Sequence, residues 1–299
     1  MYLSPRLQLS WKAVVIAIPF FWLLIFFLAP FLIVLKISVA ESLIASPPYS
    51  PLFQEGTDGD LSLNFIYENY AYLWRDNLYV SAYLNSIRIS AMSTLVCLVI
   101  GYPIAYAIAR SSSTTRFVLL MLIILPFWSS FLLRVYAWMG LLADQGTINS
   151  LLVWLGLIDR PIRLMYSEFA VHIGIVYSYL PFMILPLYAN IEKLDISLHE
   201  VSADLGARPV VTFLTITLPL TMPGIAAGSL LVFIPATGEF VIPDLLGGGN
   251  VLMIGQVLYG EFNANHDWPM ASAVAVILLL VLLVPVMLYQ YTQSRDKNH

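Results

Sequence analysis

The chain has 299 residues, of which 60% are hydrophobic and only 11% are charged. Soluble domains usually contain about 25% charged residues and about 45–50% apolar residues, so a water-soluble fold could not bury this much apolar surface. The net charge of −4 excludes the basic surface that nucleic-acid binding requires. Because Cys97 is the single cysteine, the chain can form neither an internal disulfide nor a site with several thiolate ligands.

Long apolar runs predict helices that cross a membrane, since about 20 helical residues span the ~30 Å hydrocarbon core. The first run, 13–35, is longer than the roughly 7–15 apolar residues of a signal peptide, so we expect a retained helix; the alternative is cleavage after Ala40. The uncharged stretch 209–238 contains Pro219 and Pro223, which predict an interfacial helix followed by a span that begins near Leu220. The other four runs are 89–109, 117–143, 169–191 and 268–294. The predicted fold class is an all-α, polytopic membrane protein with about six transmembrane helices.

The distribution of lysine and arginine predicts the orientation, because these residues are retained on the cytoplasmic side. With the N-terminus inside, the basic residues of the cytoplasmic segments are Arg6, Lys12, Arg110, Arg116, Lys193, Arg208, Arg295 and Lys297, whereas those outside are Arg75, Arg160 and Arg163. Both termini are therefore expected in the cytoplasm. The segment between the first two spans is rich in proline and glycine, which predicts an irregular external loop.

Residues 192–219, between the fourth and fifth spans, predict two short helices on the inner surface. Ser197-Leu198-His199-Glu200 fits a capping box, in which the serine and glutamate side chains satisfy free backbone N–H groups at a helix start. This helix is expected to end at Gly206, and Pro209 suits the first turn of a second helix that Pro219 would close. On these features alone, the hairpin could be a simple amphipathic connector.

Five residues of this hairpin have the spacing of a known motif: Glu200, Gly206, Ile216, Leu218 and Pro219. Their pattern resembles the EAA loop of ABC importer permeases, although Val201 and Ser202 stand where that motif usually has alanines. The resemblance implies that the loop docks in a groove of a cytoplasmic ATPase and that these five residues couple the two proteins.

A wider resemblance to polyamine permeases is carried by PFWSS at 126–130, YLPFM at 179–183, LPLTMPG at 218–224 and GEFVIPDLLGG at 238–248. It runs over nearly the whole chain and is densest over 85–288. It implies an ABC type I transmembrane core at 81–292 that contains the coupling loop 192–219. The remaining parts would be an N-terminal transmembrane helix with its external loop at 1–80 and a cytoplasmic tail at 293–299.

This resemblance implies a permease subunit of an ATP-driven importer of putrescine or spermidine in a bacterial inner membrane. The expected partners are membrane lipid, a second homologous permease that completes a heterodimer, two ATP-binding subunits and an external binding protein. Since the motif G-x-x-x-x-G-K-[ST] is absent, ATP hydrolysis is expected in a separate subunit, and we expect no enzymatic activity, cofactor or metal in this chain. The alternative class is a stand-alone secondary transporter or channel for a small cation, which would not need a docking loop.

Glu239 and, after it, Asp244 are the candidate substrate-binding carboxylates. They lie near Pro235 and Pro243, which predict broken backbone that lines a cavity rather than lipid. The ammonium groups and methylene stems of a polyamine suit spaced carboxylates and aromatic faces. The candidate aromatic wall consists of Phe240, Trp128, Tyr136 and Trp138. In the alternative interpretation, Glu239 pairs with Arg134 and only holds two spans together.

Overall fold

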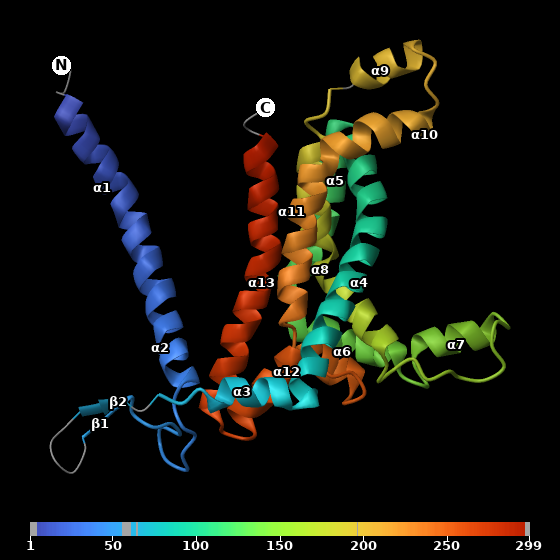
Figure 1. Ribbon diagram of the computed structural model, residues 1–299. Coiled ribbons are helices and arrows are strands. Elements are labelled where there is room, and N and C mark those ends of the chain that lie inside the picture. Colours follow the sequence, from blue (N-terminus) through green and yellow to red (C-terminus); the bar gives the residue numbers. More distant parts are fainter. Residues whose placement is uncertain (1–4, 56–60, 64, 196, 297–299) are drawn as a thin grey trace. The chain divides into compact units, whose positions relative to one another are not determined.

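The computed structural model describes residues 5–55, 61–63, 65–195 and 197–296, which fold mainly into helices (Figure 1). It divides into two compact units, Met1–Asn77 with Leu258–Leu280 and Leu78–Val257 with Val281–His299. Among the described residues, five helices are long and apolar enough to cross a membrane, and a bent pair of helices makes a sixth candidate. The predicted all-α, polytopic fold class with about six spans is confirmed.

The first unit begins with one long helical run whose side chains, from residue 13 onward, are almost all exposed. Its elements are α1 (Pro5–Leu23), the π-helical segment η1 (Leu24–Leu28), α2 (Ala29–Ser38), β1 (Phe53–Glu55), β2 (Leu61–Leu63), α3 (Glu68–Arg75) and parts of α12 (Ile254–Asn263) and α13 (Trp268–Asp296). α1, η1 and α2 follow one another without a break, and the apolar side chains of this run are mostly exposed. In a membrane, such side chains face lipid or another chain.

The loop after α2 is more regular than its proline and glycine content predicts. β1 and β2 form an antiparallel hairpin, and α3 follows. The side chain of Asn69 in α3 donates hydrogen bonds from Nδ2 to the carbonyls of Ser38 (3.0 Å) and Ala40 (2.9 Å). The first bond satisfies a carbonyl that the end of α2 leaves free, and the second holds the chain just beyond the helix. The expectation of an irregular loop was therefore wrong for these segments.

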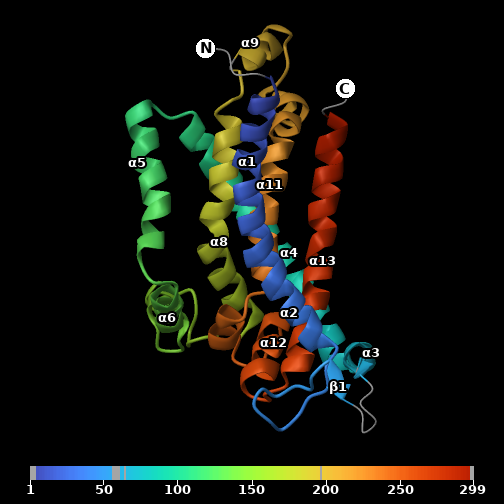
Figure 2. The same cartoon turned by 90° about the vertical axis from the view of Figure 1, so that its left-hand side faces the viewer.

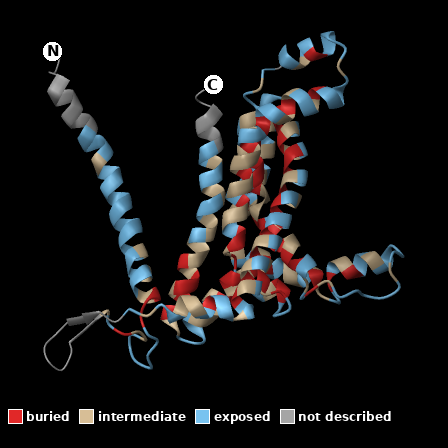
Figure 3. Cartoon of the chain, in the orientation of Figure 1, coloured by how far each residue is buried: buried red, intermediate tan, exposed pale blue. Residues whose placement is uncertain are grey.

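The second unit contains the helices of the predicted core. They are α4 (Asn77–Ala109), α5 (Ser113–Ile124), the 3₁₀ turn η2 (Leu125–Trp128), α6 (Phe131–Leu142), α7 (Thr147–Trp154), α8 (Glu168–Ile191), α9 (Ser197–Asp204), α10 (Pro209–Thr212), the π-helical segments η3 (Phe213–Thr217) and η4 (Pro243–Gly247), and α11 (Leu218–Thr237). α4, α8 and α11 lie side by side, with α9 and α10 at one end and α6 and α7 at the other (Figure 1). Buried residues concentrate along these three helices (Figure 3).

Two glycines allow α8 and α11 to approach closely. A Cβ atom at Gly228 would lie 2.8 Å from Sδ of Met183, and one at Gly224 would lie 2.7 Å from Cβ of Asn190. The two glycines are four residues apart, so they lie on one face of α11. Small residues at this spacing favour helix association in membranes, where van der Waals packing replaces the hydrophobic effect.

The predicted third span, 117–143, is not one straight helix. The helical segments Ser113–Trp128 and Phe131–Trp154 meet at an angle of 92°. Figure 2 shows α6 viewed along its axis at the end of α5. Pro126 contributes no backbone N–H, and its carbonyl accepts both the backbone N–H (3.2 Å) and the hydroxyl (2.7 Å) of Ser129, which closes the turn. The prediction of an unbroken span was therefore wrong.

Pro219 does not close a helix as predicted. It occupies the first turn of α11, where a missing N–H costs no hydrogen bond, and the helical backbone is continuous from Pro209 to Thr237. Figure 1 shows that the chain changes direction between α10 and α11. The predicted division into two helices was therefore wrong for the backbone, because η3 turns the chain without ending the helix.

Candidate functional site

Glu239 lies where the helical backbone of α11 stops and restarts. α11 ends at Thr237, and the next helical turn begins at Val241. Oε1 of Glu239 accepts the backbone N–H groups of Val241 (3.0 Å) and Ile242 (3.4 Å), and Oε2 accepts the hydroxyl of Tyr179 in α8 (2.5 Å). The residue is only 8% exposed. A carboxylate has about four acceptor positions, so these three donors satisfy most of its capacity.

The backbone at Glu239 is packed tightly against Gly255, near the start of α12. A Cβ atom at Gly255 would lie 2.5 Å from the carbonyl oxygen of Gly238 and 2.6 Å from that of Glu239. The neighbouring Ile254 donates its backbone N–H to the hydroxyl of Ser86 in α4 (2.7 Å). The broken segment is therefore held by α8 through Tyr179 and, through the residues that begin α12, by α4.

The remaining candidate residues of the substrate path are only partly brought together. Asp244 is exposed on η4. Phe240 follows Glu239 in the sequence, and its side chain is 37% exposed. Trp138 packs against the buried cluster that includes Ile242, and so does Tyr179. The other two wall candidates, Trp128 and Tyr136, are largely exposed, Trp128 by 81%.

Tyr179 is the residue that the sequence reasoning left out of the predicted wall. It opens the 179–183 stretch, and that position was the available signal. Its neighbour Tyr177 packs edge-to-face on Trp138, with ring centroids 5.5 Å apart. Aromatic side chains of α8 and α6 therefore lie near the segment that carries Glu239.

Arg134 does not pair with Glu239. Its guanidinium lies over the rings of Phe127 (5.3 Å) and Phe131 (5.8 Å), and its Nε is buried without a hydrogen-bond partner among the described residues. Both ion pairs found in the described part of the chain are elsewhere, between Arg88 and Glu168 and between Arg116 and Glu192. The alternative interpretation of Glu239 as the partner of Arg134 is not supported by this geometry.

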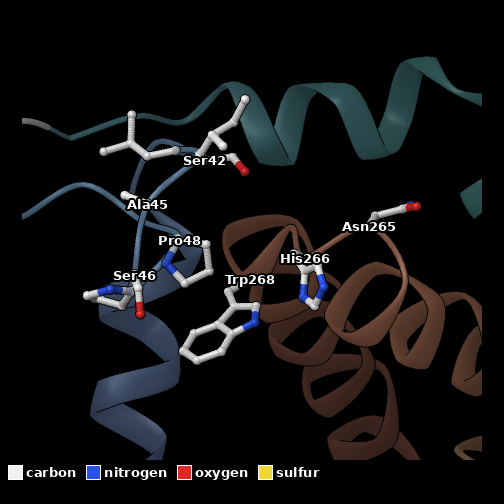
Figure 4. Close-up of a pocket in the computed structure, with 10 residues that line it drawn as sticks. Ser42, Ala45, Ser46, Pro48, Asn265, His266 and Trp268 are labelled. Carbon is white, nitrogen blue, oxygen red and sulfur yellow. The ribbon is translucent and has the colours of Figure 1, made fainter.

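The first unit contains a cavity of about 700 Å³ that is lined by none of the predicted site residues. Figure 4 shows it between the segments that carry Ser46 and His266, with the indole of Trp268 on one side. That indole stacks on Phe262 with ring centroids 5.1 Å apart. Among the described residues that line this cavity there is no carboxylate, so these residues do not supply the charge that would bind an ammonium group.

The hairpin of α9 and α10 forms as its sequence predicts at the turn. Gly206 has a φ of +78°, and the helix end is closed by hydrogen bonds from the backbone N–H of Gly206 to the carbonyl of Ala203 (2.9 Å) and from Ala207 to Ser202 (3.0 Å). These two bonds are those of a Schellman motif. A Cβ atom at Gly206 would meet no atom within 4 Å, so the backbone conformation alone requires glycine.

The start of α9 differs from the predicted capping box. α9 begins at Ser197, and the carboxylate of Asp195 accepts the backbone N–H of that serine (3.0 Å). The N–H and hydroxyl of Ser197 hold the pKa of the Asp195 carboxyl below its ordinary value. Asp195 therefore takes the capping role that the sequence reasoning gave to Ser197.

α9 has an inward polar face and an outward apolar face. On the inward face, the buried hydroxyls of Ser202 and Thr212 are 2.7 Å apart, which explains a serine at a position where alanine is usual. The outward face carries Leu198 and Val201, and Leu205 continues it directly after the helix; all three are exposed, Leu205 by 82%. Their spacing places them on one stripe of the helix.

The five predicted coupling residues divide between the tip and the base of the hairpin. Glu200 and Gly206 are exposed at the tip. Ile216 and Leu218 are half-buried and Pro219 is exposed where η3 joins α11. Leu218 packs against the buried cluster shared by α4 and α8. The tip is thus accessible to a partner, whereas the base is part of the core.

Comparison with known proteins agrees with this arrangement. Residues 98–296 match the family described as binding-protein-dependent transport system inner membrane component. The chain is 40% identical over 280 residues to the spermidine/putrescine transport system permease protein PotB of Haemophilus influenzae, covering 94% of this chain and 93% of that protein. It is 45% identical over 225 residues to PotB of Escherichia coli K12, covering 75% and 82%. It is 34% identical over 211 residues to the inner membrane ABC transporter permease protein YdcU of the same strain, covering 67% of each.

Two solved structures share the fold. One is a bacterial ABC transporter that imports alginate (TM-score 0.71, 17% identity, 97% of both chains), and the other is the bacterial alginate ABC transporter in complex with its pentasaccharide-bound periplasmic protein (TM-score 0.72, 19% identity, 98% of both chains). The fold is that of a multi-pass ABC importer permease of the inner membrane. The chain belongs to the binding-protein-dependent transport system inner membrane component family. The predicted family and fold are confirmed, and a stand-alone carrier is not favoured.

Proposed function

We propose that the chain is the membrane-spanning permease subunit of an ATP-driven importer of putrescine, spermidine or both. The observation that carries this proposal is the identity of 40% to a spermidine/putrescine permease over 94% of the chain. The buried Glu239 and the exposed Asp244, with aromatic residues of α6 and α8 nearby, supply groups that suit a polyamine.

The assembly that we propose contains a second homologous permease, two ATP-binding subunits and an external binding protein. Both termini and the hairpin of α9 and α10 face the cytoplasm. The exposed stripe Leu198, Val201 and Leu205, with Glu200 beside it, docks on an ATPase subunit. Closure of the two ATPases on ATP then draws the coupling hairpins together and opens the membrane cavity toward the binding protein.

Each segment of the chain has its own proposed role. Residues 81–292 form the permease core with the coupling loop 192–219, residues 1–80 add a transmembrane helix and an external loop, and 293–299 form a cytoplasmic tail. In the core, Glu239 and then Asp244 bind ammonium groups, and Phe240, Trp128, Tyr136 and Trp138 form the wall of the path. Gly206, Ile216, Leu218 and Pro219 support Glu200 in the coupling hairpin.

Uptake in cells tests the substrate. A strain that lacks this chain is supplied with labelled putrescine and, separately, labelled spermidine, with and without the chain restored from a plasmid. We expect uptake of at least one of them to be lost in the deletion strain and regained on restoration. Unchanged uptake of both in the deletion strain, in cells whose other polyamine importers have been removed, would contradict the polyamine assignment.

A further inference from the structure

His199 is the side chain of α9 that reaches the ends of two spans. Its Nε2 lies 3.0 Å from Oγ1 of Thr217, at the end of η3 where α11 begins. Its Nδ1 lies 3.5 Å from Nη2 of Arg110, directly after the end of α4. His199 is half-buried and lies on the inward face of α9, three residues before the buried Ser202.

The partners of His199 determine its tautomer. An arginine side chain only donates hydrogen bonds, so Nδ1 must accept from Arg110 and the ring proton must lie on Nε2. Nε2 then donates to the hydroxyl of Thr217, which is itself buried. The neutral imidazole satisfies both contacts. A doubly protonated ring would instead present an N–H to the guanidinium of Arg110, which removes that contact and places two positive charges together.

Few other polar contacts hold α9 to the spans. Within the described residues, the hydrogen bond between Ser202 and Thr212 holds α9 to α10 inside the hairpin. The side-chain hydrogen bonds of α9 to Thr217 in η3 and to Arg110 after α4 both come from His199. A cavity of about 240 Å³ lies beside this histidine, lined among others by Tyr106, Ala203 and Phe213. On this side, α9 is therefore not closely packed against α4 and η3, and the contacts of His199 cross the space.

The residues around His199 come from α4, α10, η3 and α9 itself. Tyr106 of α4 lines the cavity with it, and the guanidinium of Arg110 lies over the ring of Tyr106 at 5.4 Å. The facing residues of α10 and η3 are Pro209, Thr212, Phe213 and Thr217, none of which carries a charge. On α9 itself, the acidic residues are Glu200 and Asp204.

We propose that His199 is a positioning residue that transmits movement of α9 to the inner ends of α4 and α11. This inference rests on the proposed role of the hairpin as the coupling element. An ATPase that moves the outward stripe of α9 displaces the spans through the contacts of the inward face. Ser202 ties that face to α10, which continues into α11, whereas His199 ties it directly to Thr217 at the start of α11 and to Arg110 after α4.

The test is the ratio of ATP hydrolysed to polyamine imported by the reconstituted importer complex in proteoliposomes. His199→Ala should assemble, because the Ser202 bond to Thr212 remains, but should raise this ratio about fivefold or more, the lower end of usual coupling between sites. Thr217→Val should act in the same direction, and the double variant should add little to His199→Ala, since the contact that Thr217→Val removes is already lost in that variant. Asp204→Asn, an exposed change on the same helix, is the control and should match the wild type.

Rescue by a conservative variant separates this role from a merely structural one. His199→Gln carries one amide donor for Thr217 and one amide acceptor for Arg110, so it should restore a ratio close to that of the wild type. A wild-type ratio in His199→Ala, or a ratio in His199→Gln as high as in His199→Ala, would overturn the inference. Failure of the wild-type complex to import any polyamine would instead contradict the proposed function.

Discussion

Glu239 combines a structural contact with the charge that a polyamine requires, and the two can be separated by substitution. In Glu239→Gln, the amide oxygen can still accept the N–H groups of Val241 and Ile242, and the amide N–H₂ can donate to Tyr179, whose hydroxyl also accepts. The geometry is kept while the charge is lost. Hydrogen bonds to charged groups exceed neutral ones by about 1 kcal/mol, so the stability of the complex should fall only slightly.

Polyamine uptake by Glu239→Gln should fall far more than its stability. Loss of one partner of a buried charge contact costs about 2 kcal/mol or more, which corresponds to about 30-fold in affinity. Labelled uptake at low substrate concentration and the melting temperature of the purified complex are the two measurements. Tyr179→Phe, which removes one neutral donor, is the matched control and should retain uptake. Normal uptake in Glu239→Gln would remove Glu239 from the substrate path.

A substitution of Gly206 tests the coupling hairpin through its backbone conformation, without removing a side-chain contact. Its φ of +78° costs a β-branched residue roughly 1–2 kcal/mol or more, although a Cβ atom would have room. Gly206→Val should therefore distort the tip and reduce ATPase activity stimulated by the loaded binding protein, while membrane insertion stays normal. Gly206→Asn, which tolerates this conformation better, should be less affected. Wild-type stimulation in both Gly206→Val and Glu200→Ala would reduce the hairpin to a connector.

Residue roles were predictable from sequence where they depend on local backbone chemistry. The left-handed turn at Gly206 follows from glycine at a helix end, and the broken backbone near Glu239 follows from its neighbouring prolines. The contact with Tyr179 did not follow, because 60 positions separate the two residues and hydropathy does not reveal which faces of two helices meet. The roles of Asp195 and His199 likewise depend on the folded hairpin.

At the scale of elements, the close packing of α8 on α11 predicts strong sensitivity to side-chain volume. Gly228→Leu would place its Cβ 2.8 Å from Sδ and 3.1 Å from the carbonyl oxygen of Met183, and the backbone atom cannot move away cheaply. Overpacking of this kind costs about 1–3 kcal/mol. The melting temperature of the detergent-purified complex should drop clearly. Gly140→Ala, where a Cβ atom meets nothing within 4 Å, is the control; an equal melting temperature for both variants would contradict the packing described.

Hydropathy located most spans but not the directions of their helices. The runs 89–109 and 169–191 fall inside α4 and α8, because long apolar segments have few alternatives to a spanning helix. The break at Ser129 and Ser130 was missed because apolar residues continue on both sides of it. Conversely, the sequence analysis predicted that Pro219 ends a helix, whereas Pro219 lies in the first turn of α11, where a proline is tolerated. A proline that ends one helix and a proline that begins the next look alike in the sequence unless the start of the second helix is known.

At the scale of the whole molecule, the orientation is the prediction on which the coupling proposal depends. In a Cys97→Ala background, a cysteine at Ser62 should react with an impermeant thiol reagent in intact cells, and one at Ser112 should react only after the membrane is opened. The reason is the excess of lysine and arginine in the segments assigned to the cytoplasm. Labelling in the reverse order would place the hairpin of α9 and α10 outside, where no ATPase could reach it.

The class of the molecule was evident from composition and from one motif, whereas its assembly was not. A chain with 60% hydrophobic residues must lie in a membrane, and the spacing from Glu200 to Pro219 indicated an ABC importer permease. The exposed apolar faces of α1 and α9 show that parts of the surface require lipid or partners, but exposure does not identify those partners.

The coupled permease is tested most directly by spermidine and putrescine uptake into proteoliposomes that contain the complex purified through a tag on this chain. We expect an ATPase and a second permease to copurify, and we expect uptake to require both ATP on the side of the hairpin and the loaded binding protein on the other. Polyamine uptake by this chain alone, driven by an ion gradient and indifferent to ATP, would contradict the proposed function and identify a secondary transporter.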